Sequence, residues 1–427
     1  MTTSAVAWRF ADLPSAVTDI LRKAALLPAV WVDVADVVAV CALPEAQVHR
    51  AVERLADAGL IAEDSRHDDR FVITAAAREL LADDPRALSQ RECAGTRSRW
   101  YAWLVRSATM AQGAVSPARR VTRLAREYRY AAGFTVPFTG GWAAWAWLDE
   151  RQRTLEATIR AAAADELLTV VWQLTDAISP LARTWRDPAS WVEGHTLAVE
   201  AATACGDPRA AMVLGVRRGG GLAATGETGE AVAVLEALRA RAARARDVAI
   251  QAQAGQELAG VHARRHGPPS GREQAWICLA EAIRLWEGAG DQWAAGLARY
   301  ELGVLELAMG NPGGAQDALS RARTALEDQG DARSAAWALA HLGLAVARGG
   351  RPAAGEERML LAQREFTAGG DRAGVVVCLR MRAAAFRERG RDAEALRLLQ
   401  RAARITGTAP DSPQARRIED HSPGGTG

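Results

Sequence analysis

Two segments of the chain carry residue types at spacings that could support chemistry. The run Arg217–Gly229 (RRGGGLAATGETG) has the glycines of a phosphate-binding loop, and His262 and His266 are spaced i,i+4, so one helix face could present two metal ligands. A Walker A loop also needs a lysine at the phosphates, and the only lysine, Lys23, has no glycine loop before it. P-loop hydrolysis is therefore excluded. We expect no metal at the histidine pair, because no carboxylate or cysteine stands at a supporting interval.

A tryptophan trio, Trp142, Trp145 and Trp147, could line a small-molecule pocket such as that of a pathway enzyme. Core packing of a single helix explains the same spacing more simply. The chain has no G-x-S-x-G, H-E-x-x-H or C-x-x-C motif, and its five cysteines stand far apart. We therefore predict a protein without catalytic residues, cofactor or metal.

Composition and charge narrow the class of protein further. Alanine dominates the apolar stretches, which favours close-packed helices over β-sandwiches. The formal net charge of +2 gives no overall field toward nucleic acid or a membrane. The first residues lack the basic and apolar regions of a signal peptide, and the cysteines show no disulfide framework. These features predict a reduced, cytoplasmic protein.

The elements that position these residues follow from an internal repeat of about 40 residues. Its marks are Gly-Asp pairs, with Arg246-Asp247 filling one gap: Gly206-Asp207, Gly290-Asp291, Gly330-Asp331 and Gly370-Asp371. Glycine closes one helix in the left-handed conformation, and aspartate caps the N–H groups that open the next. A fixed period of this size is typical of stacked helical hairpins.

A second set of marks recurs inside each period. A small residue comes first, at Gly219, Gly260, Gly303, Gly343 and Ala383. A turn glycine follows seven positions later, at Gly226, Gly267, Gly310, Gly350 and Gly390. A bulky residue comes next, at Leu235, Leu279, Leu319, Met359 and Leu399. This is the spacing of a tetratricopeptide hairpin, and it places the glycine-rich run and the histidine pair within structural turns.

The repeat predicts the fold class, a mainly α protein with a tetratricopeptide-like α-solenoid over residues 151–407. An atypical capping hairpin should open the array, and residues 408–427 should form a disordered tail. The first helices of the hairpins would form an inner groove that binds a protein, a peptide or a ligand. The candidate groove residues on those helices are Arg299, Glu306, His341, Arg380 and Arg387.

Residues 1–92 have the order of elements of a winged-helix domain. Helices are predicted at 14–27, 32–40 and 44–59, then strand-like runs at 60–62 and 71–73, and a last helix at 75–81. Ten basic residues stand against fifteen acidic ones, a difference of −5, and this disfavours DNA because phosphate contacts supply most non-specific affinity. If the domain does read DNA, the contacts would be Arg50, Arg54, Arg66, His67 and Arg70.

Residues 93–150 form a basic, aromatic connector. Between 97 and 130, eight arginines face the single acid Glu127, and Arg119, Arg123 and Arg126 would share one helix face. That face could bind nucleic acid or an acidic partner through charge and stacking. The simpler interpretation is that its charge complements the acidic N-terminal domain.

The order of these parts resembles a known architecture. ALLPAVWVDVADVVAVCALPEAQVHRAVERLADAGLI, RWYAWLVRSATMAQGAVSPARR, AWLDERQRTLEATIRAA and the Gly-Asp repeats are similar to the C-terminal half of the AfsR-like regulators of actinobacteria, members of the STAND class. Those relatives also carry an NB-ARC NTPase domain, often with a DNA-binding domain before it, and this sequence shows neither. The resemblance implies that the winged helix serves chiefly as an interdomain arm. Arg151 and Thr154 depart from the acid and amide usual in the connector.

We therefore predict a non-catalytic regulatory or adaptor protein that binds a partner in the groove of its repeats, in transcriptional or pathway regulation. One alternative is a DNA-binding transcription factor that uses the winged helix. The other is a pathway enzyme whose pocket is lined by tryptophans.

Overall fold

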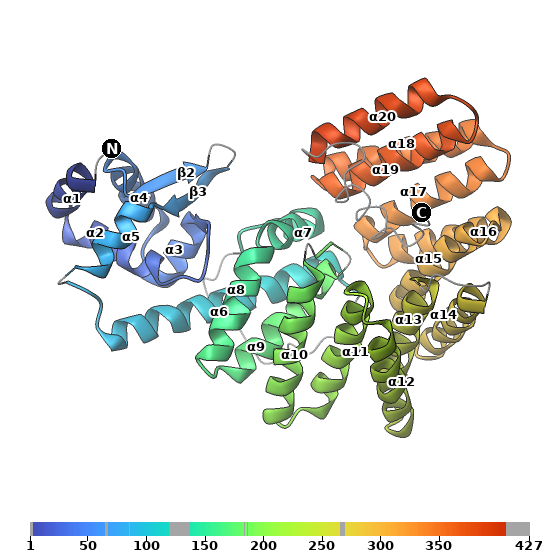
Figure 1. Ribbon diagram of the computed structural model, residues 1–427, viewed down its shortest axis with the longest axis horizontal. Helices are drawn as coiled ribbons and strands as arrows, with labels where there is room; N and C mark the ends of the chain where they lie inside the picture. The colour runs from blue at the N-terminus through green and yellow to red at the C-terminus, as the bar shows by residue number, and fades with distance from the viewer. Residues whose placement is uncertain are drawn as a thin grey trace.

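The computed structural model describes residues 3–64, 67–84, 86–118, 136–182, 184–185, 187–264 and 270–406 (Figure 1). These residues are mainly α-helical. They form an N-terminal unit of helices with a small sheet, a connector built around one long helix, and a curved array of helical hairpins. The predicted tail at 408–427 lies outside the described residues.

The N-terminal unit combines five helices with an antiparallel sheet. The helices are α1 (Thr3–Asp12), α2 (Ser15–Ala25), α3 (Val34–Cys41), α4 (Glu45–Asp57) and α5 (Ala75–Ala82). The strands are β1 (Val32–Asp33), β2 (Ile61–Asp64) and β3 (His67–Ile73), in the order β1-β3-β2. The predicted order of three helices, hairpin and helix is present. Sequence reasoning missed α1 and β1, because a two-residue strand and a chain-terminal helix leave little periodic signal.

The core of this unit includes an apolar stripe on α4. Val48, Val52 and Leu55 are buried, as expected from their i,i+4 and i,i+3 spacing. They pack in one cluster with Leu60 and with Phe71 of β3. The hairpin β2–β3 therefore closes the apolar face of the helices.

The connector and the start of the array follow. Their elements are α6 (Gln90–Val115), α7 (Gly140–Glu150), α8 (Gln152–Ala164), α9 (Leu168–Ala177), the 3₁₀ turn η1 (Ser179–Leu181) and α10 (Pro188–Ala204). A capping box starts α6, where Ser89 and Glu92 bond each other's backbone N–H groups. Trp172, Trp185 and Trp191 are buried in this part of the chain.

Five hairpins complete the described array. Their helices are α11 (Pro208–Ala224), α12 (Thr228–Arg244), α13 (Val248–Arg264), α14 (Ser270–Gly288), α15 (Gln292–Ala308), α16 (Pro312–Asp328), α17 (Ala332–Arg348), α18 (Pro352–Ala368), α19 (Arg372–Arg387) and α20 (Asp392–Thr406). Successive hairpins stack side by side into a curved array (Figure 1). The predicted period is confirmed, and the 44-residue repeat is the one in which α14 is longer than its neighbours.

The turn glycines adopt the predicted left-handed backbone. Gly226, Gly310, Gly350 and Gly390 within hairpins, and those of the Gly-Asp pairs between hairpins, have φ between 71° and 91°. Arg246 takes the same conformation at a φ of 56° where the glycine is missing. Gly267 lies outside the described residues. The recurring glycines of the sequence therefore mark the positions at which the backbone is left-handed.

Three of the aspartates that recur between hairpins, two in Gly-Asp pairs and one after Arg246, have two partners each. Oδ1 of Asp371 accepts the Gly374 N–H at 2.9 Å, the expected helix cap, while Oδ2 accepts the Arg333 guanidinium at 3.0 Å. Asp331 likewise caps α17 and accepts Trp293 Nε1 at 2.8 Å. Asp247 caps α13 and accepts Arg209 Nε at 2.8 Å. In each case the donor stands two residues after the aspartate of the preceding repeat, so one residue type both starts a helix and joins two hairpins.

Replacing Arg246 by glycine is expected to stabilise the array by about 1 kcal/mol. A left-handed conformation costs a non-glycine residue roughly 1–2 kcal/mol, part of which the greater chain entropy of glycine offsets. Arg246 is exposed, so little packing is lost. The measurement is the urea midpoint of unfolding. Arg244→Gly, at the right-handed end of α12, should lower it instead, and equal effects of the two changes would contradict the expectation.

Candidate interaction surfaces

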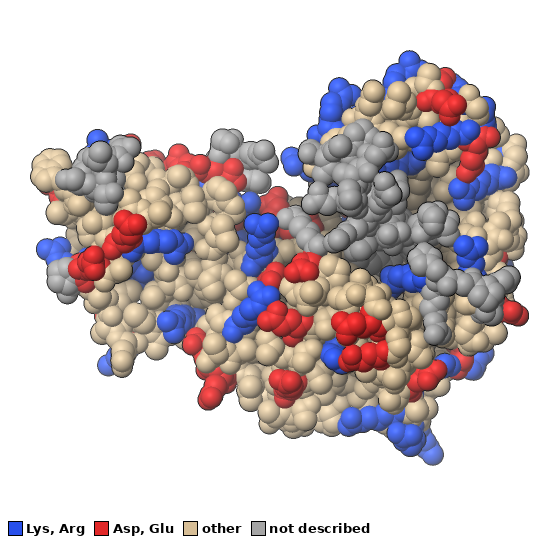
Figure 2. All heavy atoms as spheres, viewed as in Figure 1, with Lys and Arg blue, Asp and Glu red and all other residues tan. Residues whose placement is uncertain are grey.

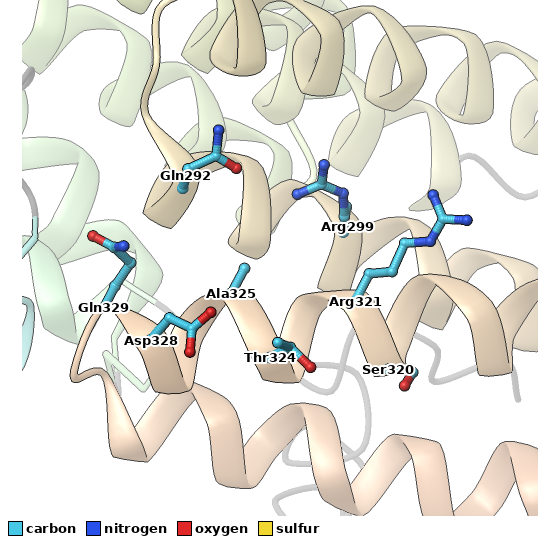
Figure 3. Close-up of a pocket in the computed structure, with 8 residues that line it drawn as sticks. All are labelled: Gln292, Arg299, Ser320, Arg321, Thr324, Ala325, Asp328 and Gln329. Carbon is cyan, nitrogen blue, oxygen red and sulfur yellow. The ribbon is translucent and has the colours of Figure 1, made fainter.

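An open polar groove lies between α15 and α16 (Figure 3). Its volume is about 390 Å³, within the range of ligand sites. It is lined by Gln292 and Arg299 of α15 and by Ser320, Arg321, Thr324, Ala325, Asp328 and Gln329 of α16. We call it the α15–α16 groove.

The local sequence explains why this groove exists. On α16, Ala315, Leu319, Ala322 and Leu326 form the buried row, which turns the polar row at 320, 321, 324 and 328 outward. At the floor, a side chain at Gly296 would begin 3.2 Å from the Ala325 Cβ, so two small residues bring the helices together. Long polar side chains rise on both sides of that contact.

Charge is unevenly distributed along the groove. Arg299 pairs with Glu287, and Arg321 Nε lies 3.1 Å from Asp317, a pair whose side chains are both about two-thirds exposed. Within the described part of the chain, no ion pair reaches Asp328, which is exposed. Figure 3 shows the two arginines on one half of the groove and Asp328 with Gln329 on the other.

The five residues predicted for the groove lie in different surroundings. Arg299 lines the α15–α16 groove, but six of the eight lining residues come from the second helix of the hairpin rather than from first helices. Glu306 accepts hydrogen bonds from Trp276 Nε1 and Asn311 Nδ2, both at 2.8 Å, at the hairpin turn. Arg387 is exposed at the end of α19, and Arg380 is half-buried.

His341 departs most from the prediction. It is 3% exposed, its Nδ1 lies 3.0 Å from the Trp337 carbonyl, and its ring meets Tyr300 edge to face. It therefore packs between α17 and α15 and cannot face an open groove. The prediction placed the groove on the first helices of the hairpins, so it did not include the polar row of α16.

The tryptophan trio makes packing contacts in place of a shared pocket. Trp142 packs edge to face on Phe366 of α18, and its ring occupies the space that a side chain at Gly369 would take. Trp145 lies beneath the Arg333 guanidinium, 4.1 Å from its ring centroid. Trp147 packs against Trp103. Helix α7 thus touches the far hairpin α17–α18, beside which it lies in Figure 1.

The proposed nucleic-acid contacts divide into two groups. Arg50 and Arg54 are exposed on α4. Arg70 is not free to meet a phosphate, because it donates to Asp33 at 2.8 Å and to Glu150 at 2.9 Å. Arg66 and the side chain of His67 lie outside the described residues. Acidic and basic side chains are interspersed on the face drawn in Figure 2, with no field of one sign.

The described arginines of the basic connector bond to other parts of the protein. Arg99 donates to the Val40 carbonyl at 2.7 Å, and Arg97 lies 3.5 Å from Asp165. Arg119, Arg123 and Arg126 fall outside the described residues. Arg99 thus joins the connector to α3 through a backbone carbonyl, and the charge complementarity between the connector and the acidic N-terminal domain stays a prediction.

A buried ionic cluster joins the N-terminal unit to the connector. The Arg151 guanidinium is 4% exposed and bonds Asp33 and Asp36, the latter at 3.1 Å, while Arg70 bonds Asp33 and Glu150. Arg151 also lies 4.9 Å from the ring centroid of Trp147. Burial raises the pKa of Asp36, and the Arg151 charge opposes that rise. Arg151 stands where the AfsR-like regulators usually have an acid, and in this chain its partners are Asp33 and Asp36.

The glycine-rich run is also structural. Its first residue, Arg217, is 5% exposed and bonds the fully buried Asp176 at 2.6 Å. Gly219 and Gly221 lie against Leu235 and Trp191, whose atoms stand less than 3.0 Å from a would-be Cβ. The run therefore lets α11 approach its neighbours closely.

Two further features, a metal-binding cluster and a membrane-spanning helix, are both absent from the described part of the chain. His266 lies outside it, and no group of three or more His, Cys, Asp and Glu residues there could hold a metal ion. None of the described helices combines the length and the apolar character needed to cross a bilayer.

His195 makes the stability of the array depend on pH. It is fully buried against Trp191, and burial lowers its pKa to about 4. The unfolded chain, with a histidine pKa of about 6.5, binds the proton more readily, so stability present above pH 6.5 is lost as pH falls toward 4.

We expect this residue to remove about 2 kcal/mol between pH 8 and pH 5. The measurement is the difference in unfolding free energy between the native chain and His195→Phe across that range. The variant should lose the histidine part of the pH dependence. Parallel pH profiles for the two proteins would contradict the expectation.

No protein-family model and no curated protein matches the chain. Among solved structures, it is similar to a Rap protein complexed with competence and sporulation factor, at 12% identity and a TM-score of 0.47, over 78% of this chain and 92% of that one.

Two further structures show weaker likeness. A STAND-class signal transduction ATPase with a tetratricopeptide repeat sensor from Pyrococcus horikoshii is 13% identical, with a TM-score of 0.38, over 96% of this chain and 59% of that one. A circular tandem repeat protein is 12% identical, with a TM-score of 0.23, over 99% of both chains. At these low scores, the assignment of the fold rests on the geometry of the hairpins themselves.

Proposed function

We propose that the chain is a non-catalytic adaptor whose repeat array binds a segment of another protein, in the regulation of transcription or of a biosynthetic pathway. The observation that carries the proposal is the α15–α16 groove, which is open and lined mainly by polar side chains of α15 and α16. Two other charged clusters described above, Arg151 with Asp36 and Arg217 with Asp176, are buried ion pairs within the protein. They support a rigid frame around a binding surface.

We infer further that the N-terminal unit is a winged helix that serves as an arm between domains. Its helix order, hairpin and pairing of β1 with β3 support that assignment. The ion pairs of Arg70 and Arg151 with Asp33 favour a docking role, because the strand that would approach DNA is held against the connector.

A DNA-binding role for the same unit rests on the exposure of Arg50 and Arg54. It predicts a salt-dependent shift of promoter DNA that Arg50→Ala/Arg54→Ala abolishes. Absence of binding at low salt would rule it out.

The adaptor proposal is tested by selecting from a phage-displayed random dodecapeptide library on the immobilised full chain. Enrichment of related sequences that bind the chain as synthetic peptides is the expected result. If no peptide is enriched over bare support, the proposal of peptide binding fails.

A further inference from the structure

The α15–α16 groove has a basic end and an acidic end. Arg299 and Arg321 stand together at one, and Asp328 stands at the other (Figure 3). Arg321 and Asp328 are seven residues apart on α16, a rise of about 10 Å. A ligand that satisfies both ends must carry opposite charges at that separation.

The charge pattern argues against a phosphorylated or nucleotide ligand. A polyanion would gain from the arginines but would meet the exposed Asp328 carboxylate within the same groove. A zwitterionic ligand avoids that repulsion. The charge pattern therefore selects for a molecule with one acidic and one basic group.

The uncharged polar residues along the groove match a peptide backbone. Ser320 and Thr324 offer hydroxyls, and Gln292 and Gln329 offer amides, all of which both donate and accept hydrogen bonds. A peptide in the polyproline II conformation has no internal hydrogen bonds, so its N–H and C=O groups need such partners. It also has three residues per turn and a rise of about 3.1 Å, which puts residues i and i+3 on one face about 9 Å apart.

The existing ion pairs do not block this site. The pair of Arg321 with Asp317 joins two largely exposed side chains, and such pairs contribute little to stability. Arg321 can therefore exchange Asp317 for a ligand carboxylate at small cost. Arg299 is held by Glu287 with its side chain 16% exposed, which fixes the basic wall of the groove.

We propose that the α15–α16 groove binds an extended, polyproline II-like peptide segment that carries an acidic and a basic residue three positions apart. This inference rests on the proposed adaptor function and names the class of partner that it takes. Because such a peptide can lie in either chain direction, the two charges are specified by spacing and not by order.

The test uses the same dodecapeptide selection on four groove and control variants of the full chain. Peptides selected by the native chain should carry Asp or Glu three positions from Lys or Arg. Asp328→Arg makes the groove wholly basic and should select two acidic residues at that spacing. Arg321→Asp should shift the selection toward two basic residues. The controls Asp392→Arg and Arg401→Asp change the same charges on exposed positions of α20 and should select like the native chain.

The affinity of each variant for a synthetic peptide selected by the native chain then gives the size of the effect on binding. Fluorescence polarisation should show binding about tenfold weaker for each groove variant, because reversal removes an attraction and adds a repulsion, and unchanged binding for each control. If peptides are enriched but carry no such charge pair, or if groove and control variants select alike, the groove assignment fails while the adaptor function stands. If nothing is enriched, the adaptor function itself fails.

Discussion

Replacing Arg151 by methionine is expected to cost about 3–5 kcal/mol of stability, because the change leaves the Asp36 carboxylate buried without its partner. Asp36 is fully buried, and Arg151 donates to it at 3.1 Å across the junction between α3 and α8. Asp33 keeps Arg70 as a partner, but Asp36 has no second ion pair within the described ranges. The deficit should appear in urea unfolding and as faster hydrogen exchange in α3 and α8.

The sign of its pH dependence follows from the same carboxylate. Burial raises the pKa of Asp36, and without the Arg151 charge it should rise further. The folded variant then binds a proton that the unfolded chain releases above about pH 3.9, so its stability falls as pH rises. Measured against the native chain, the deficit should therefore shrink in acid.

Two further variants make the interpretation specific. Asp36→Asn/Arg151→Met removes the buried charge and should recover much of the loss. Arg153→Met removes an exposed arginine from the same helix and should stay within about 0.5 kcal/mol of the native chain. Equal stability of the Arg151 and Arg153 variants would show that the cluster does not hold the junction.

Gly343→Ala is expected to destabilise the hairpin α17–α18 by at least about 3 kcal/mol. A Cβ at Gly343 would meet the Met359 Cγ at 2.7 Å, the Gly355 carbonyl oxygen at 2.8 Å and the Met359 nitrogen at 2.9 Å. Two of these are backbone atoms, so no rotamer change relieves the overlap and the helices must separate. The change should outweigh the gain in helix propensity of about 1 kcal/mol.

The matched control is Gly288→Ala at the end of α14, where a Cβ would meet nothing within 4 Å. It should be neutral or stabilise by up to about 1 kcal/mol. The measurements are the urea midpoint and hydrogen exchange of α17 and α18, because a repeat array opens locally. A similar midpoint for both variants would contradict the close approach of the helices.

The hairpins could be predicted because their marks act locally. Gly370 needs a left-handed backbone and Asp371 caps the helix that follows, whatever lies elsewhere in the chain. The positions of the small and the bulky residue in each repeat could be predicted in the same way. Leu319 lies on Gly303 and Met359 on Gly343, sixteen residues apart in both cases. At Gly260, in the repeat with the insertion, the neighbour found among the described residues is the end of Arg264.

The long-range contacts could not be predicted in the same way. Arg151 meets Asp36, and Trp142 meets Phe366, because of how rotations accumulate along the connector and array. No periodic signal encodes such a meeting. His341 shows the related limit within a repeat, since the face that it presents to Tyr300 depends on the packing of the preceding hairpin. Of the candidate groove residues, Arg299 is the one that lines the α15–α16 groove.

The contact of α7 with α17 and α18 has a mechanical consequence. A solenoid held only by neighbouring repeats behaves as a spring that lengthens smoothly when its ends are pulled. Here Trp142 packed on Gly369 and Trp145 under Arg333 attach the hairpin α17–α18 to helix α7 near the start of the array. The array between α7 and α18 should resist extension stiffly until the contacts of Trp142 and Trp145 break. It should then extend more easily, so its force–extension curve would show a distinct yield point.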